Sequence, residues 1–131
     1  MHSFEEIKER IRGFHFDEDF DLVVAIANGG IIPAALLNQR LGLPLETIKL
    51  SLRDPAQKPL FDAPKLLEPI RFDYKGRRIL LVEDRVKTGA TLNKAKALLE
   101  KDAALVKTFA VNGKADYSLF DEACFKFPWI L

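Results

Sequence analysis

Cysteine, histidine and net charge are all scarce in this sequence of 131 residues. The single cysteine, Cys124, excludes an internal disulfide framework and is typical of a reducing compartment. The two histidines, His2 and His15, show no metal-ligand spacing, so we expect no metal site built by the protein alone. Twenty basic residues balance nineteen acidic ones without any basic block, which argues against nucleic acid as a partner.

Long hydrophobic runs are also missing. The longest uninterrupted one, Leu22–Ala27, is far shorter than the roughly 18 residues that suggest a membrane helix. The first residues, MHSFEEIKERI, contain no apolar core and are unlike a signal peptide. We therefore expect a cytoplasmic protein with no membrane partner. The length suits one domain, residues 1–131, with a hydrophobic core of its own.

Short strands and helices alternate along the chain. Ser3 and Glu6 form a capping box at the start of an amphipathic helix, predicted over residues 3–12. Leu22–Ala27 is rich in Val and Ile, as in a strand buried on both faces. The other expected elements are strands at 44–52, 78–82 and 104–111, helices at 31–41 and 91–101, a long loop at 53–69 and an irregular segment at 112–131.

This alternation predicts an α/β fold with a central parallel sheet flanked by helices. Ligands of such sheets bind beyond the carboxyl ends of the strands. Both glycine turns, at residues 28–30 and 88–91, follow predicted strands and fall at that edge. We therefore expect them to share one ligand.

The segment LLVEDRVKTGATL, residues 80–92, combines three features of a ribose phosphate site. An apolar strand ends in two adjacent carboxylates, Glu83 and Asp84, which can accept hydrogen bonds from two vicinal hydroxyls. Thr88–Thr91 then opens a helix, whose free backbone N–H groups and dipole favour a phosphate. Gly89 permits close approach of the backbone to that phosphate.

This segment resembles the signature of type I phosphoribosyltransferases, which bind phosphoribosyl pyrophosphate (PRPP). The resemblance implies a Rossmann-like fold with a small C-terminal hood, and Mg²⁺ bound mainly through PRPP. Glu83 and Asp84 would hold the ribose hydroxyls and act in catalysis. It also implies a homodimer and small-molecule substrates, PRPP and a nucleobase. The residues expected to bind the 5-phosphate are Lys87, Thr88, Gly89, Ala90 and Thr91.

A second segment, VVAIANGGIIPA, resembles the pyrophosphate loop of the same family. The resemblance assigns pyrophosphate binding to Asn28, Gly29 and Gly30. Many members carry Arg or Lys where this chain has Asn28, so pyrophosphate binding here would need other cations. Arg53, in the loop after the second strand, is one candidate for that role.

The tail, GKADYSLFDEACFKFPWIL, resembles the hood of hypoxanthine/xanthine/guanine phosphoribosyltransferases. The resemblance implies that Lys114 or Lys107 donates a hydrogen bond to a purine 6-oxo group. The position expected to stack on the base falls on Cys124, so the neighbouring Phe125 would have to replace it. The alternative is that the aromatic residues of the tail pack the C-terminus onto the core.

Lys87 departs from the pattern of the 6-oxopurine enzymes, which usually have an aspartate before Thr-Gly. A lysine cannot serve as the general base at neutral pH unless its pKa falls by several units. We expect a purine base, but the sequence alone does not choose among nucleobases.

Two other functions stay open at this point. The first is a non-catalytic PRPP or nucleotide sensor on the same fold, which the departures at Asn28, Leu52 and Lys87 favour. Purine-specific relatives often have Ser-Tyr where this chain has Ser51-Leu52. The second is a receiver-type or flavodoxin-like domain, although Leu22–Ala27 runs directly into glycine without the acidic residue expected there. Release of pyrophosphate from PRPP separates the enzyme from both.

Overall fold

A single sheet organises the computed structural model, which describes residues 2–51 and 65–131. Within these residues the sheet has six strands in the order β3-β2-β1-β4-β5-β6. All neighbours are parallel except β2 and β3, which are antiparallel. The strands are β1 (Leu22–Ala27), β2 (Leu45–Ser51), β3 (Lys65–Leu66), β4 (Arg78–Arg85), β5 (Leu105–Asn112) and β6 (Tyr117–Phe120).

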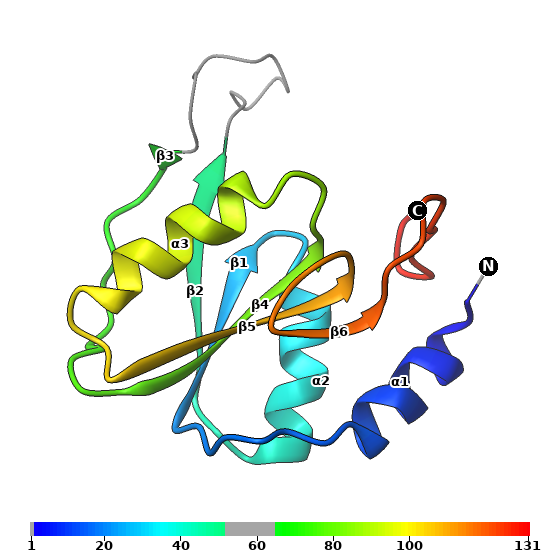
Figure 1. The fold of residues 1–131 in the computed structure, drawn as a ribbon, viewed down its shortest axis with the longest axis horizontal. Helices are drawn as coiled ribbons and strands as arrows, with labels where there is room; N and C mark the ends of the chain where they lie inside the picture. Colours follow the sequence, from blue (N-terminus) through cyan, green and yellow to red (C-terminus); the bar gives the residue numbers. More distant parts are fainter. Residues whose placement is uncertain (1, 52–64) are drawn as a thin grey trace.

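Helices cover both faces of this sheet (Figure 1). In the described part of the chain they are α1 (Phe4–Gly13), α2 (Ile31–Leu41) and α3 (Ala90–Glu100). The side chain of Ser3 caps α1 by accepting a 3.1 Å hydrogen bond from the Glu6 amide. At the end of α2, Gly42 takes the left-handed conformation that stops a helix, with φ of 67°.

Two hydrophobic clusters fill the space between the sheet and its helices. One lies under α1 and α2 and includes Ile7, Leu37 and Phe109, all fully buried. The other lies under α3 and includes Leu81 and Leu99. Alternate residues of the central strands point into opposite clusters, which explains why β1 and β4 are apolar on both faces.

The expected α/β architecture is confirmed, with two corrections to its strands. Residues 117–120, expected to be irregular, form β6, because they pair in parallel with the edge of β5. Lys65–Leu66, expected to be loop, forms β3 against the end of β2. Both strands are too short for an alternating pattern to reveal them, and both depend on a partner strand distant in sequence.

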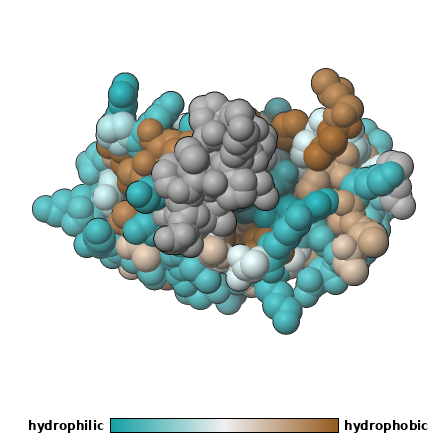
Figure 2. Space-filling model, turned by 90° about the horizontal axis from the view of Figure 1, so that it is seen from above, coloured by the Kyte–Doolittle hydropathy of each residue, from teal (hydrophilic) through white to brown (hydrophobic). Residues whose placement is uncertain are grey.

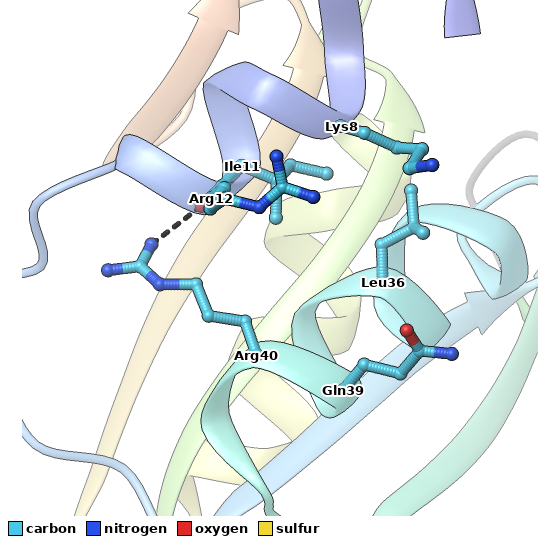
Figure 3. A pocket seen from close by; sticks show the side chains of 6 residues that line it. All are labelled: Lys8, Ile11, Arg12, Leu36, Gln39 and Arg40. Atoms are coloured by element: carbon cyan, nitrogen blue, oxygen red, sulfur yellow. Dashed lines mark hydrogen bonds between the residues drawn. The ribbon is translucent and has the colours of Figure 1, made fainter. Parts of the chain in front are cut away.

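Side chains of α1 and α2 also meet outside the clusters (Figure 3). Arg40 reaches across from α2 and donates a 2.7 Å hydrogen bond to the Ile11 carbonyl of α1. Its guanidinium also lies 5.3 Å from the ring centroid of Phe16. A cavity of about 240 Å³ remains between the two helices and is lined by Lys8, Ile11, Arg12, Leu36, Gln39 and Arg40. These contacts tie the N-terminal helix to the sheet through α2.

Gly30 ends the turn after β1, where this turn approaches β4. A Cβ atom at Gly30 would lie 2.3 Å from the carbonyl oxygen of Val82 and 2.8 Å from that of Ile26. The Gly30 amide also donates a 2.8 Å hydrogen bond to the Ile26 carbonyl. Only glycine therefore lets the turn come this close to the neighbouring strand.

We predict that Gly30→Ala lowers the free energy of unfolding by about 1–3 kcal/mol, because its Cβ meets backbone atoms that cannot move aside. Gly13→Ala is the matched control. A Cβ at Gly13 meets nothing within 4 Å, so this helical substitution should be neutral or stabilising by about 0.5–1 kcal/mol. Urea denaturation measures both changes, and equal stabilities of the two variants would contradict the prediction.

Candidate ribose phosphate site

Glu83 and Asp84 lie at the carboxyl end of β4, where the strand leaves the core. Both are half-buried, whereas Leu81 and Val82 before them are fully buried. The backbone amide of Asp84 donates to Glu83 Oε1 at 3.1 Å. The amide of Arg85 in turn donates to Asp84 Oδ1 at 2.6 Å. The backbone therefore orients both carboxyl groups before any ligand arrives.

This pair is unusual in its protonation. Burial, and after it the negative charge of Asp84, raises the pKa of Glu83 from 4.5 to about 8. The pair consequently holds a proton at neutral pH. A protonated carboxyl can donate one hydrogen bond and still accept others, so the pair can bind hydroxyl groups in both directions.

The loop after β4, residues 86–89, which we call the first loop, forms a turn at the start of α3. Gly89 has φ of 85°, a conformation that glycine adopts without strain, and it precedes the first residue of the helix. The N-cap residue, Gly89, has no side chain to cap α3, and Thr88 Oγ1 accepts from the first amide of the helix, that of Ala90, at 3.2 Å. The other amides of the first turn can donate to an external acceptor such as a phosphate.

A cavity of about 410 Å³ lies at this loop. Its lining brings together one of the two residues predicted for the ribose and all five predicted for the 5-phosphate. They are Glu83, Lys87, Thr88, Gly89, Ala90 and Thr91, joined by Arg85, Val86 and Leu92.

The turn after β1 contains Asn28 and Gly29, both exposed, and the buried Gly30. The peptide bond between Ala27 and Asn28 is cis. Asn28 lines a second cavity, of about 200 Å³, together with Lys49 of β2. Lys49 pairs with Ala27 in the register of the sheet, so its backbone lies beside the residue that precedes Asn28.

The two loops meet at Gly29 and Asp84. A Cβ atom on Gly29 would lie 2.6–2.8 Å from the Asp84 carboxylate, so this glycine leaves the space that the carboxylate occupies. The structure thus brings together both predicted loops, which are more than fifty residues apart in the sequence. A single ligand can reach both of them.

The predicted base-binding residues have different surroundings. Lys114 is exposed and follows Gly113. A Cβ at Gly113 would lie 2.3 Å from the Val86 carbonyl, so the backbone that precedes Lys114 lies beside the first loop. Lys107 pairs with Leu80, three positions before Glu83, and so lies roughly 10 Å from the carboxyl edge. Of these two lysines, Lys114 is the one near the site.

Phe125 is only 6% exposed. The rings of His2, Phe120 and Phe127 surround it, with centroids 4.9–5.2 Å from its own. This burial corrects the expectation that Phe125 offers an open ring face to a base, because its faces already pack against other rings. Cys124 beside it is exposed. Packing of the aromatic tail onto the core is the alternative that the structure supports.

Arg53 and Leu52 lie outside the described residues. Lys49 escaped the sequence reasoning, because it lies in the middle of a strand, where a charged residue ordinarily signals a solvated face. Arg85 belongs to the segment expected around the 5-phosphate, but its contacts with Phe125 and Phe127 appear only in the structure.

Neither a membrane-spanning helix nor a cluster of three potential metal ligands occurs within residues 2–51 and 65–131.

Seen from above, the C-terminal end forms a hydrophobic projection at the right of Figure 2. Ile130 and Leu131, both exposed, belong to this end of the chain.

Comparison with known proteins agrees with this geometry. The phosphoribosyl transferase domain matches residues 2–129. An orotate phosphoribosyltransferase of Sulfurisphaera tokodaii is 36% identical over 88 residues, which are 67% of this chain and 40% of that protein. An adenine phosphoribosyltransferase of Treponema denticola is 32% identical over 107 residues, which are 77% of this chain and 56% of that protein. The chain spans about half the length of these curated relatives.

Solved structures extend the likeness to the fold. A purine phosphoribosyltransferase from Pyrococcus horikoshii superposes with a TM-score of 0.75 and 26% identity, covering 98% of this chain and 91% of that one. A hypoxanthine phosphoribosyltransferase from Trypanosoma cruzi, in complex with IMP, shares the fold with a TM-score of 0.71 and 21% identity, covering 92% of this chain and 74% of that one. By the domain match, the six-stranded sheet and the loops at its carboxyl edge, this chain belongs to the phosphoribosyl transferase domain family.

Proposed function

We propose that this protein transfers the 5-phosphoribosyl group of PRPP to a purine base and releases pyrophosphate. The meeting of the acidic pair with two glycine turns at one edge of the sheet carries this proposal. The half-buried pair offers acceptors for a diol, and the cavity beside it opens onto the N-terminus of α3. A ribose 5-phosphate has both of these groups in one molecule.

The chemistry follows from where the charges lie. Glu83 and Asp84 would hold the 2′ and 3′ hydroxyls. The negative charge that the pair keeps beside its shared proton would stabilise the positive charge that develops on the ribose as its bond to pyrophosphate breaks. Lys87 and the turn Thr88–Thr91 would hold the 5-phosphate. Because both ends of the ribose are fixed, its C1 atom faces the incoming nitrogen of the base in one orientation.

Mg²⁺ fits this site as a partner of PRPP. The donors beside the two loops are carboxyl and hydroxyl oxygens, the hard ligands that Mg²⁺ prefers, while most of its ligands would come from PRPP and water. Bound in this way, the ion would neutralise charge on the leaving pyrophosphate.

Pyrophosphate would bind at the turn of Asn28, Gly29 and Gly30. Asn28 can donate a hydrogen bond but carries no charge. Lys49 lines the same cavity, and we propose that its ammonium supplies the missing positive charge from the neighbouring strand. Arg53 stays a candidate for the same task.

For the base, a relative whose structure matches 98% of this chain and 91% of its own is named a purine phosphoribosyltransferase, and this supports a purine. Lys114 is the candidate donor to the base, given its place beside the first loop. Lys87 before Thr88 favours a purine that needs no acidic group at that position. Orotate is the competing base, since one relative is named for it. The homodimer implied by the family stays a prediction.

The proposal is tested with PRPP, Mg²⁺ and a panel of adenine, hypoxanthine, guanine, xanthine and orotate, monitored for nucleotide formation. We expect turnover with a purine, and a loss of about 100-fold or more in kcat for Asp84→Asn, since a neutral amide stabilises a cationic ribose poorly. Asp102→Asn is the control, because Asp102 is exposed and follows α3, away from the acidic pair. Binding of PRPP without turnover of any base would show the non-catalytic sensor instead.

We predict that Lys49→Met raises the KM for PRPP by about tenfold, the effect expected for losing one charge-assisted contact to pyrophosphate. The KM for the base should stay within about twofold, because the base approaches the face of C1 opposite the pyrophosphate and would not contact Lys49. Lys94→Met, at an exposed position of α3, is the matched control. An unchanged KM for PRPP would remove Lys49 from the site.

The protonation of Glu83 should make the free energy of unfolding of the ligand-free protein depend on pH. Because the folded-state pKa of Glu83 is raised to about 8, protonation stabilises the fold fully below the unfolded pKa near 4.5, and this stabilisation is lost as pH rises through about 8. Glu83→Gln lacks this loss. The free energy of unfolding of the variant, relative to that of the wild type, should therefore rise by roughly 1–3 kcal/mol between pH 5 and 8.5. Urea unfolding at both pH values measures the rise, and parallel pH profiles would contradict it.

A further inference from the structure

The C-terminal hood segment, residues 121–129, packs against the end of the chain's central sheet. The side chain of Asn112, the last residue of β5, holds its start from both sides. Its amide nitrogen donates to the Glu122 carbonyl at 3.0 Å, and its oxygen accepts from the Glu122 amide at 2.9 Å. His2 adds a contact from the N-terminus, with its Nε2 2.9 Å from the Glu122 carboxylate.

Arg85 holds the middle of the same segment. Its guanidinium donates a hydrogen bond to the carbonyl oxygen of Phe125. The guanidinium carbon also lies 5.1 Å from the ring centroid of Phe127, within the range of a cation–π contact. Arginine suits this double task, because its planar fork can donate from its edge while its face rests on a ring.

The other end of Arg85 belongs to the ribose phosphate site. Its backbone amide donates to the Asp84 carboxylate at 2.6 Å, and the residue lines the cavity of the first loop. One residue thus contacts both the acidic pair and the hood segment. A displacement of the hood segment would therefore move Arg85 and, through its backbone amide, the Asp84 carboxylate.

We propose that Arg85 is a positioning residue that fixes the hood segment against the first loop and thereby sets the base end of the site relative to the ribose end. This inference rests on the proposed function. Its guanidinium is committed to Phe125 and Phe127, so the residue acts through the hood and not as a ligand of the phosphate. Removing it should weaken recognition of the base and leave the ribose phosphate contacts in place.

The test compares two probes on the same variants by isothermal titration calorimetry. Ribose 5-phosphate reports on the first loop alone, and the nucleoside monophosphates AMP, IMP and OMP add a base. For Arg85→Met we expect about tenfold weaker binding of the preferred nucleotide, while binding of ribose 5-phosphate changes by less than about twofold. Arg85→Lys, which keeps the charge and one donor, should recover part of the nucleotide affinity.

Arg77→Met is the matched control, since Arg77 precedes β4 at the opposite edge of the sheet and its guanidinium forms a 4.0 Å ion pair with Asp21, away from the site. Amide hydrogen exchange over residues 121–129 provides an independent readout and should be faster in Arg85→Met than in the wild type.

Several results would overturn the inference. An equal loss for ribose 5-phosphate and nucleotide would make Arg85 a phosphate ligand. Faster amide hydrogen exchange in residues 121–129 with unchanged nucleotide affinity would show that Arg85 has a purely structural role. A wild-type protein that binds no nucleotide more tightly than ribose 5-phosphate would also refute it. Failure of the proposed function appears separately, as an absence of turnover, because the binding comparison needs no catalysis.

Discussion

The close approach of the turn after β1 to the end of β4 is the constraint on which the whole site depends. Gly30 places its Cα against the Val82 carbonyl, and Gly29 leaves the space that the Asp84 carboxylate fills. Since β1 and β4 are neighbouring parallel strands, their carboxyl ends lie roughly 5 Å apart. Two loops with different chemistry therefore face one ligand. A side chain at Gly30 would press on the backbone of the strands, and one at Gly29 would displace the Asp84 carboxylate.

Electrostatics then decide what this edge can hold. Two adjacent carboxyl groups repel each other where the strand is still half-buried, and the raised pKa of Glu83 is the response to both burial and that repulsion. A few residues later, the start of α3 offers backbone N–H groups to an anion. Diol-binding and phosphate-binding groups can thus lie side by side, because carboxyl acceptors end the strand and backbone amide donors begin the helix.

Cationic residues around this edge do not occupy the positions that the family pattern suggests. Asn28 brings no charge to the pyrophosphate turn, while Lys49 of the adjacent strand lines the same cavity. Arg85 comes directly after the acidic pair, and its guanidinium contacts Phe125 and Phe127 of the hood segment. Such placements cannot be read from motif spacing, since each depends on which strand lies next to which.

From the sequence alone, the three helices, the strands β1, β2, β4 and β5, the α/β class and the two loops could be predicted, because buried parallel strands and glycine turns leave strong local patterns. The sequence also pointed to Glu83, Asp84 and the turn at Thr88 as one site. The remaining features required partners distant in the chain, and these came from the tertiary structure. It paired β6 with β5, buried Phe125 among other rings, and brought Lys49 beside Asn28 and Arg85 against the hood. These outcomes depend on packing between segments far apart in the chain, for which no local pattern exists.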